Sequence, residues 1–186
     1  MKKVRLLLAV SGMILIAACA PLKVDQIPPR TPTALLLDIK TLADSDDLTN
    51  VNAVAKQLRI DLVRGPEKPI YIDDGKTLLG YGVDVIEKGM AKEYTPDNFH
   101  YGIFTPENRR FNRVLLSISL NSESICVTPA DLKEVFGEVK RYVSPNLSSL
   151  EYSYENPRVE NARTYFSFQS NGCLNTFGFF KNNGRE

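Results

Sequence analysis

Short runs in which apolar and polar residues alternate limit the folds that this chain can adopt. In residues 112–120 every second position is apolar, from Val114 to Leu120. A two-residue period places such side chains on one face of a β-strand. Further strand-like runs, rich in aliphatic and aromatic residues, are 69–72, 77–86, 98–104, 150–154, 162–168 and 174–180. These runs predict an antiparallel sheet, with a tight turn at Ser170-Asn171-Gly172 between the last two.

Two other segments have the spacing of helices. Apolar residues fall three and four positions apart after a cluster of capping residues, which predicts a helix over residues 47–58. Thr128 as the N-cap and Pro129 at the first helical position predict a second helix. This second helix is expected to break at Gly137 and to continue for a further turn over residues 139–142.

The order of these elements predicts an α+β fold, with helices packed on an antiparallel sheet. Residues 35–39 are compatible with either a buried strand or the start of a helix. The sequence predicts a helix followed by several strands in each half of the chain, which is compatible with two structural repeats, one in each half. We expect one folded domain over residues 34–186.

The first 18 residues have the order of an export signal. Basic residues within positions 2–5 precede an apolar run over residues 6–18, which is 13 residues long. A membrane-spanning helix needs roughly 20 residues, so we expect this segment to be a signal peptide. Ile16-Ala17-Ala18-Cys19 resembles the lipobox of bacterial lipoproteins, which implies cleavage before Cys19 and lipid on its thiol. The same resemblance, with Ala20 next, implies anchoring at the periplasmic face of the outer membrane; an ordinary signal peptide is the alternative.

The segment after the signal is rich in proline. Residues 19–33 contain four prolines, and proline-rich segments form extended, semi-rigid spacers of about 3.1 Å per residue. We therefore expect a lipidated tether that holds the domain roughly 40 Å from the membrane.

Composition fits a packed domain without a strong charge. Hydrophobic residues make up 43% of the chain, which is enough for a core. Without the first 18 of the 186 residues, 168 remain, with 20 basic and 22 acidic side chains. A nucleic-acid-binding domain needs a basic face, so nucleic acid is not an expected partner.

Two cysteines remain besides Cys19. In an oxidising compartment, Cys126 and Cys173 predict a disulfide, and two buried free thiols are the alternative. The bond would close a loop of 47 residues, worth roughly 4 kcal/mol of stability. Two cysteines and His100, without a closely spaced cysteine pair, are poorly spaced for zinc. We expect no metal and no cofactor.

No residue pattern points clearly to catalysis. His100 is the only histidine, and the chain lacks the Gly-x-Ser-x-Gly turn of many hydrolases; a structural or surface histidine is the preferred interpretation. Asp73-Asp74-Gly75 is typical of a turn rather than of a glycosidase or calcium site. Gly80-Tyr81-Gly82 lacks the third glycine of a phosphate loop. We therefore expect a binding protein rather than an enzyme.

Aromatic residues gather in the last three runs. Alternation places Tyr165 and Phe180 on the face opposite the other aromatic residues of those runs. Exposed aromatic side chains are typical of interface hot spots, but a second buried layer is the preferred interpretation.

Part of the second half resembles a group of bacterial lipoproteins. The pattern comprises Cys126-Val127-Thr128-Pro129-Ala130-Asp131-Leu132, Phe136-Gly137, Tyr165-Phe166-Ser167-Phe168 and Gly172-Cys173-Leu174. It is similar to small periplasmic lipoproteins encoded beside type VI secretion effectors, which act as immunity proteins, several of them against phospholipase toxins. The motifs are structural and carry over no binding residue.

This resemblance implies an immunity lipoprotein that binds a secreted antibacterial effector and blocks its active site. The effector would be a lipase or another enzyme that attacks the envelope. The helix-then-strands order also resembles envelope assembly lipoproteins of the BamE type and two-repeat inhibitors of periplasmic enzymes. A structural or assembly lipoprotein of the outer membrane is therefore the alternative.

Two polar loops are the candidate partner-binding sites, because exposed loops commonly carry binding residues. The candidate residues are Asp73, Asp74 and Lys76 in the first loop, and Glu107, Arg109 and Arg110 in the second.

Overall fold

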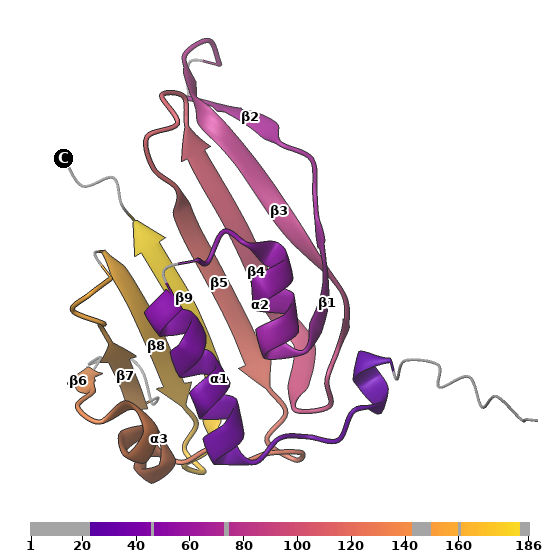
Figure 1. Cartoon of the computed structure of the whole chain (residues 1–186), viewed down its shortest axis with the longest axis vertical. Coiled ribbons are helices and arrows are strands. Elements are labelled where there is room, and N and C mark those ends of the chain that lie inside the picture. The colour runs from indigo at the N-terminus through magenta and orange to yellow at the C-terminus, as the bar shows by residue number, and fades with distance from the viewer. Residues whose placement is uncertain (1–22, 46, 73–74, 143–149, 160, 183–186) are drawn as a thin grey trace, which may run out of the picture.

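The computed structural model describes residues 23–45, 47–72, 75–142, 150–159 and 161–182. Within them the fold is α+β, as expected, with helices packed on an antiparallel sheet (Figure 1). The helices are α1 (Pro32–Ser45), α2 (Val51–Leu58) and α3 (Pro129–Phe136), preceded by a short 3₁₀ helix, η1 (Val24–Gln26). The strands are β1 (Ile60–Arg64), β2 (Lys68–Tyr71), β3 (Leu78–Met90), β4 (Tyr94–Pro106), β5 (Arg113–Leu120), β6 (Lys140–Tyr142), β7 (Leu150–Tyr154), β8 (Ala162–Phe168) and β9 (Leu174–Asn182). Cys19 and the whole signal segment lie outside the described residues.

The strands form one sheet in the order β1-β3-β4-β5-β9-β8-β7-β6, and β2 also pairs with β3. The last strands of the two halves, β5 and β9, therefore pair antiparallel at the centre. The first half carries two α-helices and the additional strand β2, whereas the second half carries one described α-helix. The idea of two half-repeats stays a prediction.

Local sequence explains where each helix begins and ends. Residues 35–39, compatible with a strand or a helix, lie in α1 and bury their apolar stripe against the sheet. Helix α2 begins later than expected because Asn50 caps it, its side chain accepting a hydrogen bond from the Ala53 amide at 3.1 Å. It ends at Arg59, whose φ is 55°.

Helix α3 confirms the capping prediction. The Thr128 hydroxyl accepts a hydrogen bond from the Asp131 amide, and the Asp131 carboxylate accepts one from the Thr128 amide. The expected further helical turn over residues 139–142 is wrong. Gly137, with φ at 71°, ends the helix, and Lys140–Tyr142 instead forms β6 beside β7.

The core lies between the helices and one face of the sheet, which we call the covered face. Figure 1 shows α1 and α2 crossing the near side of the central strands. Alternate side chains of the strands point toward these helices, including the fully buried Leu116, Phe177 and Phe179. The two phenylalanine rings pack edge to face with their centroids 6.2 Å apart.

The predicted disulfide between Cys126 and Cys173 is confirmed, with their Cα atoms 5.0 Å apart. It joins the segment that leads into α3 to the segment that leads into β9. The next residues continue the link, because the Leu174 amide donates to the Val127 carbonyl oxygen at 2.8 Å. The position of α3 on the sheet is therefore fixed covalently as well as by packing.

The packed structure begins before residue 34, the expected start of the domain. Val24 of η1 lies beside Gly89 on β3, and Arg30 is buried. Residues 23–33 thus lie on the domain instead of forming a free spacer. No helix among the described residues is long and apolar enough to cross a membrane.

Candidate functional site

The sheet face opposite the helices, which we call the open face, carries the most distinctive surface of the molecule. The strand register places Gly82 beside Phe104, Gly102 beside Leu115, and Leu115 beside Phe180. Gly102, Leu115 and Phe180 form one row across β4, β5 and β9, and Gly82 and Phe104 lie in the adjacent row on the same face. Leu115 is 41% exposed and Phe180 is 43% exposed, so neither side chain is covered by a second layer.

This exposure corrects one expectation from the sequence. Tyr165 and Phe180 do lie on the face opposite the aromatic core, as alternation indicates. The second buried layer that we expected there is absent among the described residues. Tyr165 is half-buried because its ring lies over Gly178, where an added Cβ would come within 2.2 Å of the tyrosine hydroxyl.

The apolar row borders a shallow hollow of about 260 Å³. Its floor contains Gly82 and Gly102, and its walls include Ile70, Leu115 and Phe180. Ile70 leans over Gly82, where an added Cβ would lie 2.8 Å from the Ile70 Cδ1 atom. Because the two glycines have no side chains, the hollow is deeper there, and the side chains of Ile70 and His100 can lie close to the backbone of the sheet.

Charged side chains border this hollow. The Arg113 guanidinium lies over the rings of Phe104 and Phe111, 5.6 and 5.3 Å from their centroids. It also donates to the Asn182 side-chain oxygen at 2.8 Å. An apolar centre with an arginine packed over aromatic rings is the composition that protein interfaces favour.

A second hollow of about 410 Å³ continues the open face toward β6, with Tyr142, Ser153 and Tyr165 in its lining. Arg163 also lines it, pairing with Glu155 at 2.8 Å and lying 5.9 Å from the Tyr142 ring centroid. The Ser153 hydroxyl is buried and has no hydrogen-bond partner among the described residues. The open face thus offers apolar, charged and unsatisfied polar groups along its length.

His100 also lies on the open face, where its ring stands beside Gly102. Within the described residues no hydrogen bond or ion pair joins His100 to a carboxylate or a hydroxyl group. The pairing that a Ser–His–Asp site needs is therefore not formed around it. No group of three or more metal-ligating side chains is found among the described residues either.

The candidate loop residues gather at the end of the sheet farthest from η1. The Glu107 amide donates to the Leu79 carbonyl oxygen at 3.2 Å, which holds the β4–β5 loop beside the start of β3. Arg109 stacks 4.9 Å from the Tyr81 ring centroid and pairs with Glu67 at 3.4 Å. Lys76, at the β2–β3 connection, and Arg110 are exposed at the same end. Asp73 and Asp74 lie outside the described residues.

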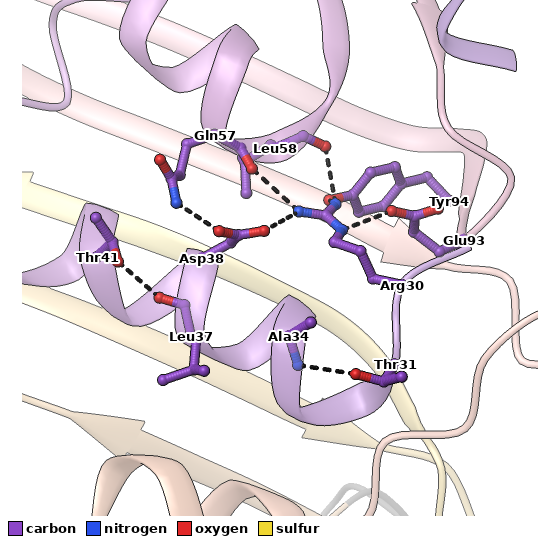
Figure 2. Close-up of polar contacts among 10 residues, drawn as sticks. All are labelled: Arg30, Thr31, Ala34, Leu37, Asp38, Thr41, Gln57, Leu58, Glu93 and Tyr94. Carbon is purple, nitrogen blue, oxygen red and sulfur yellow. Dashed lines mark hydrogen bonds and ion pairs between the residues drawn. The ribbon is translucent and has the colours of Figure 1, made fainter. Parts of the chain in front are cut away.

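A buried polar cluster around Arg30 was not anticipated from the sequence (Figure 2). The Arg30 guanidinium pairs with Glu93 and with Asp38, each at 2.7 Å. It also donates to the carbonyl oxygens of Gln57 and Leu58, each at 3.0 Å, and to the Tyr94 hydroxyl. One side chain thus joins the N-terminal segment to both α1 and α2 and to the β3–β4 connection.

The electrostatics of this cluster favour a charged guanidinium. Burial acts to lower the pKa of Arg30, but Tyr94, Asp38 and Glu93 raise it above its ordinary value. Burial raises the pKa of Tyr94, which remains a neutral phenol. The Glu93 side chain is fully buried, and its Oε2 atom has no hydrogen-bond partner among the described residues. Arg30 therefore supplies the charge that makes burial of Glu93 tolerable.

Comparison of the chain with family models, with curated proteins and with solved structures gives no match.

Proposed function

We propose that this chain is a lipid-anchored protein of the bacterial envelope that binds a protein partner across its open face. In its specific form it is an immunity lipoprotein, held at the periplasmic face of the outer membrane, that blocks a secreted effector such as a lipase. The observation that carries the proposal is the exposed apolar row at the centre of a broad sheet face.

The shape of this face favours a protein over a small molecule. Pockets for small ligands usually enclose about 300–1,000 Å³ and bury most of the ligand. The hollow beside Leu115 holds about 260 Å³ and is open to solvent along the sheet. A partner that covers several strands would bury Leu115 and Phe180 together with Arg113, and such clusters dominate binding energy.

The immunity role also needs rigidity, and the structure has a source of it. Blocking an active site requires a surface that does not deform, because ordering flexible groups costs affinity. The open face is formed by hydrogen-bonded strands, and β9 at its centre starts beside the Cys126–Cys173 disulfide. The partner-facing residues are thus on strands, whereas the candidate loop residues are at one end.

A competition assay tests the proposal. A strain that lacks this gene is grown against its parent, and it is complemented with the wild-type chain, with Leu115→Arg or with Leu37→Arg. Leu37 is the matched control, since it is 53% exposed but lies on α1, away from the open face. We expect the wild type and the Leu37 variant to protect against killing and the Leu115 variant to fail.

Other outcomes of this assay would contradict the binding surface or the immunity role. If the Leu115→Arg variant, at equal protein abundance, still protects the strain from killing, the open face is not the binding surface. A deletion strain that loses envelope integrity without any attacker would instead support an assembly lipoprotein. Absence of both phenotypes would refute both roles.

A further inference from the structure

The position of η1 limits how far the domain can stand from its proposed anchor. Lys23, the first described residue, is hydrogen-bonded into η1, because its carbonyl oxygen accepts from the Gln26 amide at 2.9 Å. Cys19 is four residues earlier, and a chain spans at most about 3.5 Å per residue. The link from the anchor to the domain is therefore no longer than about 14 Å, far shorter than a free 15-residue spacer.

The surface around η1 carries several basic side chains, which we call the basic patch: Lys23, Lys56, Arg59, Lys88 and Lys92. The contacts of their neighbours bring them together, and Gly89, next to Lys88, lies against Val24, next to Lys23. Val24 and Ile27 line the same small hollow as Lys56 and Arg59. The Ala91 amide, next to Lys92, donates to the Arg59 carbonyl oxygen at 3.2 Å.

No ion pair within the described residues engages any member of the basic patch. Three carboxylates, Asp25, Asp61 and Glu87, lie beside the five cations, so the patch keeps a net positive charge. Unpaired lysines near a bilayer with anionic headgroups are each attracted by about 1 kcal/mol. The short link from Cys19 to the domain and the positive charge of the basic patch therefore both favour contact with a membrane surface.

We propose that the basic patch docks on a bilayer that carries anionic phospholipid headgroups, which sets the orientation of the domain at the membrane. This inference rests on the lipid anchor at Cys19 in the proposed function. Strand β3 starts at the opposite end and reaches the patch after 13 residues, which at about 3.3 Å per residue is about 40 Å. The sheet then projects away from the membrane, and the loops that carry Lys76 and Arg110 lie farthest from it (Figure 1).

The orientation can be measured on the full acylated protein reconstituted into vesicles. A fluorophore is attached to a single added cysteine, either Gln26→Cys in η1 or Asn108→Cys in the β4–β5 loop. Vesicles of phosphatidylethanolamine and phosphatidylglycerol carry a nitroxide quencher on the headgroups. We expect strong quenching at residue 26 and little at residue 108.

Charge variants separate docking from simple tethering. Replacing Lys56, Lys88 and Lys92 with glutamine should weaken docking about fivefold for each lysine and should reduce quenching at residue 26. The control replaces Lys133, Arg141 and Arg158, which are exposed cations away from η1, and should leave quenching unchanged. Equal quenching at both labels, or no response to the patch variant, would overturn the proposal.

The anchor has its own readout. Mass spectrometry of the peptide that begins at Cys19, together with flotation of the protein with vesicles, reports acylation independently of orientation. A chain that is acylated and floats but shows no difference between the labels would contradict the docking alone. A chain without acyl groups would contradict both the anchor and this inference.

Discussion

Replacing Arg30 with methionine tests whether the N-terminal segment is held on the domain by the buried polar cluster. Methionine keeps much of the side-chain volume but removes the charge and every donor. The change leaves the fully buried Glu93 and the partly buried Asp38 without their cation. Breaking a buried ion pair by removing one partner costs about 3–5 kcal/mol, because an uncompensated charge stays buried.

The lost hydrogen bonds give an independent check of this magnitude. The carbonyl oxygens of Gln57 and Leu58 each lose a donor from Arg30, and an unsatisfied buried acceptor costs about 1–3 kcal/mol. The two estimates agree on a loss of several kcal/mol. For a domain of this size, 1 kcal/mol corresponds to about 2–4 °C, so the midpoint of thermal unfolding should fall by about 6–20 °C.

Urea denaturation followed by the near-ultraviolet signal of the buried tyrosines measures this loss. Arg163→Met is the control, because Arg163 pairs with Glu155 at the surface, where such pairs contribute at most about 1 kcal/mol. Combining Arg30→Met with Glu93→Gln and Asp38→Asn should restore part of the stability, since the isolated charges are then gone. A loss below about 1 kcal/mol for Arg30→Met would refute the argument from burial.

Two further predictions follow from the open face and its edge. Gly178→Ala should destabilise the protein by at least about 2 kcal/mol in the same urea assay, because its Cβ would meet the Leu116 carbonyl oxygen and the Tyr165 hydroxyl, each at 2.2 Å. Gly102→Ala should leave the stability nearly unchanged, since the atom nearest to the added Cβ is His100 Nε2, at 3.3 Å on a movable side chain. Equal losses of stability in the two variants would contradict this prediction. The hydrogen bond from Lys140 and the charge of Arg163 hold the pKa of Glu155 below its ordinary value. The stabilisation of β6 by this pair is therefore present above the ordinary carboxyl pKa and is lost as the pH falls through the lowered pKa. Protection of the β6 amides, measured as the exchange rate relative to the intrinsic rate at each pH, should fall in that acidic range, and a Glu155→Gln variant that keeps the same pH response would exclude this cause.

The sequence predicted much of the fold because several signals are local. Thr128 and Pro129 mark a helix start through hydrogen bonds within one turn, and the alternation in residues 112–120 identifies β5. Strand β1 was not anticipated. Ile60 is its only fully buried residue, so a buried-face pattern is hardly visible over its five positions.

The candidate site was harder to predict because it depends on register. Leu115 and Phe180 are 65 residues apart, and they become neighbours only when β5 pairs with β9. Their alternation with core residues showed that they point away from the core, but it did not show whether another layer covers them. For Arg30 the local sequence indicated exposure, although the side chain is buried. It follows two prolines, as in an exposed spacer, while its partners Asp38 and Glu93 lie in other elements.

The central place of β9 has a consequence for how the chain reaches this fold. Strand β9, the last of the described strands, lies between β5 and β8, so the two halves of the sheet cannot join until residues 174–182 have been made. Pairings between residues far apart in the sequence also slow folding, because a long loop must close before the contact is gained. An incomplete chain that ends before residue 174 would leave β5 and β8 as unpaired edges, which favour aggregation. We therefore expect partly made chains to depend on whatever keeps them apart until the nine residues of β9 have been made.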